Sequence, residues 1–388
     1  MRRTRAALAA LPLMLGLLGS QPAQAAAAVH SGAGGGHIPL LAYYYQWFQP
    51  SSWQRAKIDY PQLGRYSSDD TGVMRAHIAW AKSAGIDGFI VSWKSTPVNN
   101  RRLRLLMSVA ATENFKITVI YQGLDFQRRP LPTAEVTADF AAFAKWFADS
   151  PVLFRLDGKP LTVFSGTWAY THDEVAHITR PVRSKLLVLN TEKNERGYER
   201  LADVTDGDAY YWSSVNPDTN PNHAAKLDAM GQAVHTHRGY WVAPFAPGFD
   251  ARLVGGTKEV PRKNGATLRA EYTAAVGSQP DVLGLISWNE FSENSYVEPS
   301  VATGRRYLDL LRELRGGAAA GRTATHVSPA PGPHRHTLAR SAAERAWPNM
   351  LRLAGFAAVL VAAVTLLARR RAGSGIGRPG SHTERRTP

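Results

Sequence analysis

Short apolar segments alternate with helical segments throughout residues 37–315, and this alternation constrains the fold more than any other feature. Eight segments have the length and composition of buried strands: Ile38–Tyr44, Gly88–Ser92, Lys116–Tyr121, Pro160–Phe164, Leu186–Thr191, Gly207–Tyr211, Tyr240–Pro244 and Val282–Trp288. Helical patterns occupy residues 71–85, 100–113, 133–148, 173–180, 222–237, 265–276 and 305–315. Eight similar units predict an α/β fold, namely a single-domain (β/α)8 TIM barrel rather than a doubly wound open sheet.

The N-terminus has the composition of a targeting segment. Arginines at positions 2, 3 and 5 precede an apolar run from Ala6 to Leu18, and Ala23-Gln24-Ala25 has the small-residue pattern of a cleavage site. This predicts a signal peptide over residues 1–25. The glycine-rich residues 31–37 follow no strand and open no helix, so residues 26–36 are interpreted as a linker rather than a phosphate loop.

A second apolar stretch, from Leu353 to Ala368, lies near the C-terminus. As a helix it would span roughly 24 Å, short of the ~30 Å hydrocarbon core, so the predicted membrane helix is extended back to residues 347–368. Arg352 would then snorkel, and the arginines at 369–371 would remain on the cytoplasmic side. Residues 316–346 predict a flexible stalk and residues 369–388 a basic cytoplasmic tail. We therefore expect an exported, single-pass protein of the cell membrane with its folded domain outside.

The net charge of +15 raises the question of a nucleic-acid partner. Most of the excess lies in the signal segment, the stalk and the tail, which leaves about +3 for residues 31–315. The basic residues therefore belong to export and membrane anchoring, and no nucleic-acid partner is expected. The absence of cysteine excludes disulfides and thiolate metal sites.

Polar and aromatic residues follow several of the predicted strands, at the end where the active site of a barrel lies. They are Tyr44 to Trp47, Ser92 to Lys94, Tyr121 to Asp125, Thr191 to Lys193, Tyr211 with Trp212, and Trp288 to Glu290. Aromatic rings stack on the apolar faces of sugars, while acids and amides bind sugar hydroxyls. The pattern predicts a sugar-binding site with a polysaccharide or oligosaccharide as partner.

Two carboxylates, Glu290 and Glu293, follow the last predicted strand in the stretch "LISWNEFSENSYVEP". Glycosidic cleavage requires one carboxylic acid to protonate the leaving oxygen and a second carboxylate as nucleophile or base. If both residues face one cavity, burial and mutual repulsion would raise the pKa of one of them. The alternative is that Glu290 is a solvated loop residue and Glu293 a helix cap.

Several other residues are candidates for substrate binding, each with a structural alternative. Asp69 and Asp70 could bind hydroxyls or cap the helix from Thr71, and Glu192 could orient a hydroxyl or form a salt bridge with Lys193 or Lys94. Weaker candidates, because aromatic residues are also common in barrel cores, are Tyr121, Gln122, Asp125, Tyr211 and Trp212. Trp93 ends a strand where a stacking platform is expected, and Tyr44, Trp288 and Asn289 complete the set. His235 and His237 cannot face the same way on a helix, so no metal site and no cofactor are expected.

Four motifs, "LLAYYYQWFQPSSW", "YPQLGRYSSDD", "WAKSAGIDGFIVSW" and "ISWNEFSENSYVEP", together resemble the endo-alpha-mannosidase family, glycoside hydrolase family 99, across residues 38–315. The resemblance implies a barrel that hydrolyses an α-linked mannoside inside a chain, without a metal and with retention of configuration. It assigns Glu290 as a base on the 2-hydroxyl, through an epoxide-like intermediate, and Glu293 as the acid/base. It also implies a stacking role for Trp93, and it matches Arg262 to a family arginine after strand seven, although a surface role is an alternative.

The match departs from that family after Glu293, where Asn294 to Glu298 replace Gly-Thr-Gln-Ile-Glu. This variant is similar to the corresponding stretch of family 71 endo-alpha-1,3-glucanases, so such a glucanase is an alternative. With an α-glucan substrate, Glu290 would act as nucleophile or stabiliser, because the 2-hydroxyl of glucose lies cis to the α-linkage. A non-catalytic polysaccharide-binding surface protein is a further alternative. The chain is expected to act as a monomer.

Overall fold

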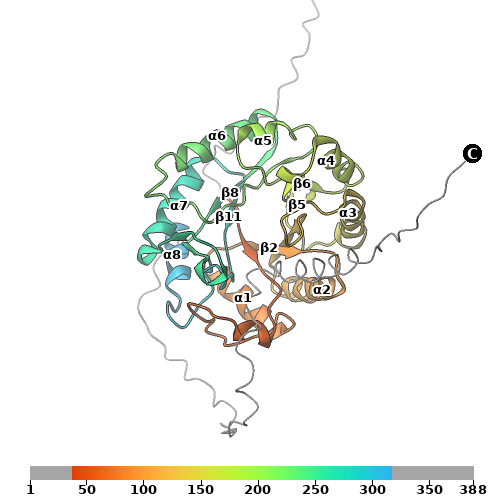
Figure 1. The fold of residues 1–388 in the computed structure, drawn as a ribbon. Helices are drawn as coiled ribbons and strands as arrows, with labels where there is room; N and C mark the ends of the chain where they lie inside the picture. Colours follow the sequence, from red (N-terminus) through yellow and green to blue (C-terminus); the bar gives the residue numbers. More distant parts are fainter. Residues whose placement is uncertain (1–36, 317–388) are drawn as a thin grey trace, which may run out of the picture. The chain divides into compact units, whose positions relative to one another are not determined.

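The computed structural model describes residues 37–316, which form an α/β unit with helices arranged around a curled sheet (Figure 1). The sheet has nine strands, and eight of them are parallel: β1 (Leu40–Tyr44), β2 (Gly88–Trp93), β3 (Lys116–Gln122), β5 (Lys159–Ser165), β6 (Leu187–Leu189), β7 (Gly207–Asp208), β8 (Tyr240–Phe245) and β11 (Val282–Leu285). All eight coincide with predicted strands. The predicted α/β class is therefore confirmed.

The sheet curls until its two edges meet. β1 pairs in parallel with both β2 and β11, so the first and last strands are neighbours. At the opposite side, Asn190 forms a parallel bridge with Asp208, and the Asn190 N–H donates to Gly207 O at 3.0 Å. The Ala209 N–H donates in turn to Asn190 O at 2.9 Å, which links the ends of β6 and β7. The result is a TIM-barrel-like ring whose strand carboxyl ends lie at one end.

The helices follow the strands in sequence and cover the outside of the sheet (Figure 1). They are α1 (Thr71–Ser83), α2 (Pro97–Thr112), α3 (Thr133–Phe147), α4 (His172–Thr179), α5 (Glu195–Glu199), α6 (His223–Thr236), α7 (Ala266–Gly277) and α8 (Arg306–Leu314). The one-turn helix α5 was not predicted, because five residues are too few to show helical periodicity. The other seven match predicted segments.

Short elements decorate the connections. β4 (Arg155–Leu156) is antiparallel to β5, and β9 (Phe249–Asp250) forms a separate hairpin with β10 (Glu259–Val260). Four 3-10 turns complete the inventory of the described residues: η1 (Pro50–Gln54), η2 (Thr167–Ala169), η3 (Arg252–Val254) and η4 (Lys263–Gly265). Of these, η1 and η2 lie in loops that follow the carboxyl ends of β1 and β5.

Strand alternation divides the interior into two cores. Leu40, Ala42 and Tyr44 of β1 belong to a large core shared with the helices. Leu41 and Tyr43 belong to a second core that contains strand residues but none from α1 to α8, so it fills the barrel itself. The position of a residue along its strand therefore decides whether its side chain faces the helices or the barrel interior.

Several predictions concern residues outside the described part of the chain. The predicted signal peptide (1–25), linker (26–36), membrane helix (347–368) and tail (369–388) all lie outside residues 37–316, as does the predicted stalk except for Gly316. Within residues 37–316, no helix combines the length and apolar character needed to cross a membrane.

Candidate active site

The loop that follows β11 carries both Glu290 and Glu293 and folds back on itself. The Glu290 N–H donates to Ser287 Oγ at 2.9 Å, and the Ser292 N–H donates to a Glu290 carboxylate oxygen at 2.8 Å. The Ser295 N–H reaches Glu290 O at 3.2 Å, which closes the loop behind the carboxylates. These bonds place Glu290 and Glu293 beyond the carboxyl end of the last strand, as predicted.

Glu290 is buried, Glu293 is half-buried, and their carboxyl groups interact electrostatically. Burial raises the pKa of Glu290 to about 8, the negative charge of Glu293 adds to this effect, and Lys57 opposes it. Burial also raises the pKa of Glu293, against the positive charge of Arg128. Glu290 is only 4% exposed, which rules out a solvated loop position, and no helix begins at Glu293 for it to cap. Because two such groups titrate together, the pair retains a proton near neutral pH.

Two tyrosines lie beside this pair. The hydroxyls of Tyr45, after β1, and Tyr211, after β7, form a hydrogen bond with each other. Burial raises the pKa of both tyrosines, and the charges of Glu290 and Glu293 raise both further, so the four side chains are neighbours. The sequence prediction named Tyr44 rather than Tyr45. The available signal was strand alternation, which puts Tyr45 on the same inward face as Tyr43.

Asn289 connects the loop to the end of β1. Its Oδ1 accepts from the Tyr45 N–H at 2.8 Å, and its Nδ2 donates to Tyr45 O at 3.0 Å and to the Tyr66 hydroxyl at 3.3 Å. Asn289 is fully buried. Asn289 was predicted to bind substrate. In the structure its amide instead holds Tyr45 in place.

Four residues that were expected to contact substrate lie in the outer core instead: Tyr44, Trp93, Tyr121 and Trp288. All four are at most 1% exposed. The Tyr44 hydroxyl contacts Nδ1 of His77 at 3.2 Å, the Trp93 indole donates to Asn100 at 2.9 Å, and the Tyr121 hydroxyl donates to Asp139 at 2.9 Å. The physical reason is that these side chains point toward the helices and not toward the mouth of the barrel.

Asp69 and Asp70 have structural roles. Asp69 accepts from Arg101 at 2.7 Å and from Arg102 at 2.8 Å, and the hydrogen bond from Arg102 is the largest of the effects that lower its pKa to about 2. Asp70 Oδ1 accepts from the N–H groups of Gly72 at 2.8 Å and Val73 at 3.2 Å. Asp70 therefore caps α1, which is the structural alternative.

Asp125 and Glu192 are likewise bonded within the protein. Asp125 accepts from the N–H groups of Gln127 at 2.8 Å and Arg129 at 2.9 Å, and it pairs with the Arg129 side chain. Glu192 is 3% exposed and accepts from Arg200 at 3.3 Å. Burial raises the pKa of Glu192. Its ion-pair partner is Arg200, and not Lys193 or Lys94 as considered from the sequence.

The last three predicted residues lie at the carboxyl end of the barrel or near it. Gln122 donates to Ser92 Oγ at 3.2 Å across neighbouring strands. Trp212 is half-buried and stacks on Tyr210, with ring centroids 6.4 Å apart. The Arg262 guanidinium donates to Asn294 O at 2.8 Å and Tyr296 O at 2.7 Å. Arg262 therefore supports the loop that carries Glu293.

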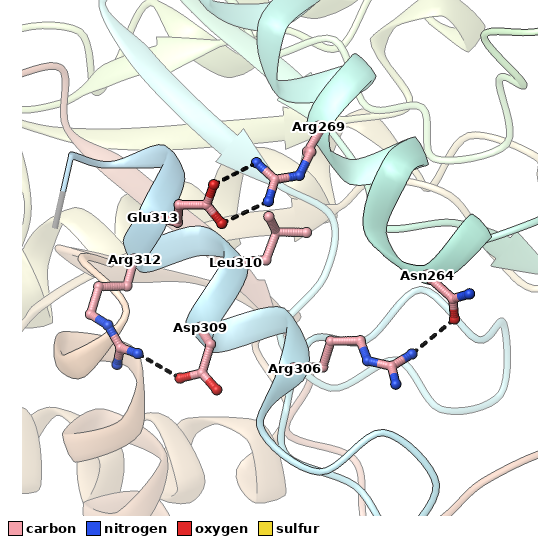
Figure 2. A pocket seen from close by; sticks show the side chains of 7 residues that line it. All are labelled: Asn264, Arg269, Arg306, Asp309, Leu310, Arg312 and Glu313. Carbon is pink, nitrogen blue, oxygen red and sulfur yellow. Dashed lines mark hydrogen bonds and ion pairs between the residues drawn. The ribbon is translucent and has the colours of Figure 1, made fainter. Parts of the chain in front are cut away.

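A hollow of about 370 Å³ lies on the outside of the barrel, where α7 and η4 meet α8 (Figure 2). Two ion pairs line it, Arg269–Glu313 at 2.6 Å and Arg312–Asp309 at 2.7 Å. Its lining includes neither Glu290 nor Glu293. Within residues 37–316, no group of three or more His, Cys, Asp or Glu side chains is arranged to hold a metal ion.

Comparisons with known proteins agree with this architecture. The structure is similar to the GH99 endo-alpha-mannosidase from Bacteroides thetaiotaomicron, with a TM-score of 0.63 and 22% identity over 72% of this chain and 98% of that chain. A second structure of that enzyme gives 0.62 and 21% identity, over 72% and 99% of the two chains. A glycoside hydrolase-like protein gives 0.56 and 16%, over 71% and 93%. At these identities the likeness shows the fold.

The sequence comparisons identify the family. No curated protein matches the chain. The sequence model of glycosyl hydrolase family 71 matches residues 62–308, which is more than half of the chain. The predicted combination of a family 99-like domain with family 71 likeness is therefore confirmed. The protein is a glycosidase and belongs to glycosyl hydrolase family 71.

Proposed function

We propose that this protein hydrolyses an α-linked polysaccharide with Glu290 and Glu293 as its catalytic pair. The observation that carries the proposal is that one loop holds a buried Glu290 and a half-buried Glu293, close enough for the charge of Glu293 to raise the pKa of Glu290. A pair that retains one proton can supply an acid and a base at the same time. The similarity to an endo-alpha-mannosidase structure supports an α-linked substrate.

The proposed mechanism retains the anomeric configuration. Glu293 donates its proton to the leaving glycosidic oxygen as the C1–O bond breaks, and Glu290 takes the proton of the 2-hydroxyl, whose oxygen closes on C1. Water then attacks C1, Glu293 takes a proton from that water, and Glu290 returns its proton to O2. The coupled pair shares one proton, and the reacting state is the one in which Glu293 carries it and Glu290 is ionised. The burial that raises the pKa of Glu290 makes this ionised form a stronger base than an ordinary carboxylate.

Membership of family 71 favours a second candidate substrate, an α-1,3-glucan. In α-linked glucose the 2-hydroxyl lies on the same face as the leaving group, so it cannot attack C1 from behind. Glu290 would then act as a nucleophile or stabilise the positive charge at C1, and Glu293 would keep the acid/base role. A non-catalytic binder, the third possibility from the sequence, is disfavoured by the family match.

The decisive experiment measures reducing-end release from α-mannan, α-1,3-glucan and isolated cell-wall glycans, with the product anomers followed by NMR. We expect release from one class of α-glycan with retention, and loss of at least about a thousandfold in kcat in Glu293→Gln. An unchanged rate in Glu293→Gln on a substrate that the wild type cleaves would disprove the acid assignment. Inversion would disprove the two-step route.

We also propose that the protein is exported and held in the cell membrane by residues 347–368, with the glycosidase domain outside. The support is the composition of the two ends of the sequence. A tag placed after residue 388 should resist protease added to intact cells, and a tag in the stalk should be cleaved. Recovery of the whole protein in the soluble fraction would overturn the anchor.

A further inference from the structure

We propose that Arg128, Trp168 and Lys193 form a binding subsite for an anionic sugar unit of the substrate, next to Glu293. The inference rests on the proposed function, which makes an α-linked polysaccharide the substrate. It adds that one sugar unit of that polysaccharide is anionic. This unit carries a carboxylate or a phosphate group, and the sugar ring stacks on the indole.

The three residues come from loops at the carboxyl end of neighbouring strands. Arg128 follows β3, Trp168 lies in η2 after β5, and Lys193 follows β6. β5 pairs with both β3 and β6, and the pairing is parallel in each case. The three loops are therefore adjacent and lie at the same end of the barrel as Glu290 and Glu293.

Two cations share one aromatic ring in this subsite. Lys193 Nζ lies 3.4 Å from the centroid of the Trp168 ring, and the Arg128 guanidinium carbon lies 5.5 Å from it. Each contact is within the range of a cation–π interaction. Trp168 and Lys193 are half-buried and Arg128 is exposed, so a ligand in solvent can reach the cluster. Two like charges on one ring repel each other and attract an anion.

Neither cation is neutralised by an ion pair among residues 37–316. Neighbouring acids are already bonded elsewhere, Asp125 to Arg129 at 2.7 Å and Glu192 to Arg200 at 3.3 Å. Lys193 does lower the pKa of Glu192 electrostatically, but the Glu192 hydrogen bond goes to Arg200. The subsite therefore presents positive charge that the protein leaves available for a ligand.

A tight turn holds Arg128 in position. The Asp125 N–H donates to Arg129 O at 2.8 Å, the Arg128 N–H donates to Asp125 O at 3.0 Å, and Arg128 itself has a φ of 61°. A left-handed conformation at a non-glycine residue is uncommon and requires a surrounding structure that enforces it. Arg128 is also close enough to lower the pKa of Glu293, which places the subsite beside the catalytic pair.

The chemistry of the cluster fits an anionic sugar better than a neutral one. A guanidinium can bind a carboxylate or phosphate through two parallel hydrogen bonds, and the lysine adds a point charge. The indole face provides the apolar platform on which a pyranose ring stacks. A neutral sugar would use the platform but would leave both cations without an ion-pair partner at hydrogen-bonding distance.

The test measures affinity by calorimetry on the full-length chain with Glu293→Gln, which prevents turnover. One probe pair is α-mannan oligosaccharides bearing mannose 6-phosphate, before and after phosphatase treatment. The other is α-glucan oligosaccharides before and after oxidation of C6 to the carboxylate. We expect the charged member of at least one pair to bind roughly tenfold tighter, with a preference that declines as salt increases. The pair that shows it distinguishes phosphate from carboxylate.

Variants assign the preference to the subsite. Lys193→Met, and Arg128→Asn, which keeps a residue that tolerates the left-handed conformation, should each weaken binding of the charged probe more than binding of the neutral probe and so reduce the preference. Trp168→Ala should weaken both probes. Lys145→Met, which removes an exposed lysine of α3 on the outside of the barrel, is the matched control and should change neither affinity.

The outcomes separate this inference from the proposed function. Equal affinity for both members of both probe pairs overturns the subsite, and so does a preference that survives Arg128→Asn combined with Lys193→Met. Hydrolysis of neutral α-glycans by the wild type would leave the proposed function intact in either case. A charge preference in binding supports the subsite even if every hydrolysis assay is negative.

Discussion

Asn289 holds the backbone of Tyr45 at both its N–H and its C=O, at 2.8 and 3.0 Å. The two residues are 244 positions apart in the chain, so this one amide joins the first strand to the loop after the last. Asn289 precedes Glu290 directly, and the Tyr45 hydroxyl bonds that of Tyr211. The position of the acidic pair relative to the tyrosines therefore depends on a residue that we place outside the substrate contacts.

The first prediction concerns Asn289→Ala. The change leaves the Tyr45 N–H and C=O buried without their partner, so the free energy of unfolding in urea should fall by roughly 2–4 kcal/mol. kcat should fall more than KM changes, because Tyr45 moves relative to Glu290. Asn100→Ala removes an amide that is bonded to the Trp93 side chain and, at 3.4 Å, to Ser95 Oγ, and it serves as the control. A kcat for Asn289→Ala equal to that of the control would contradict the positioning role.

The second prediction concerns pH and stability. Burial raises the pKa of Glu290 from 4.5 to about 8, so between these values the folded protein keeps a proton that the unfolded chain has lost. The free energy of unfolding should therefore fall as pH rises through this window, by at most about 1.4 kcal/mol per pH unit from this group. Below pH 4.5 Glu290 is protonated in both the folded and the unfolded protein, so it should no longer contribute to the pH dependence of the free energy of unfolding.

Glu290→Gln cannot ionise and should flatten the dependence, measured by urea unfolding between pH 5 and 8. Glu313→Gln is the control, since a hydrogen bond from Arg269 lowers the pKa of Glu313 and its contribution to stability is lost only at lower pH. Equal slopes for Glu290→Gln and the wild type would show that Glu290 is ionised normally.

The third prediction concerns the buried contact between Glu298 and His77. Glu298 accepts from the Tyr66 hydroxyl at 2.8 Å and lies 3.0 Å from His77 Nε2, and both members of the pair have fully buried side chains. Glu298→Ala should lower the free energy of unfolding by about 3–5 kcal/mol, because it leaves these partners unsatisfied in the core.

The exposed ion pair between Arg269 and Glu313, drawn in Figure 2, is the comparison for this prediction. Glu313→Ala should cost much less than Glu298→Ala, because solvent screens the pair. A loss for Glu298→Ala as small as that for Glu313→Ala would mean that the buried network is not important for stability.

The fourth prediction concerns Arg262→Met. This change removes the two hydrogen bonds to Asn294 O and Tyr296 O, which flank Ser295 in the loop that carries Glu290 and Glu293. The loop should become mobile on the side of Glu293, so kcat should decrease by roughly tenfold or more with a smaller change in KM. Arg269→Met removes an exposed arginine of α7 and should leave kcat unchanged. If the kinetics of the two variants coincide, Arg262 does not position the loop.

The barrel could be predicted from the sequence because strand and helix periodicity are local properties. All eight predicted strands are present, and the errors are confined to their ends: Thr191, Tyr211 and Trp288 lie beyond the strands to which they were assigned. The short helix α5 was missed because periodicity needs a longer stretch. Closure of the ring between Asn190 and Asp208 could not be seen in the sequence, because it depends on contacts between residues far apart in the chain.

For the candidate site, the sequence by itself determined the position of Glu290 and Glu293 after the last strand, since a buried strand that ends in carboxylates leaves them at the mouth of the barrel. Only the tertiary structure decided which neighbours face that mouth. Tyr44 and Tyr45 are adjacent and identical, yet one is in the outer core and the other lies beside the acids. Composition cannot distinguish them, because the difference arises from strand register and from the partner that each side chain meets across the barrel.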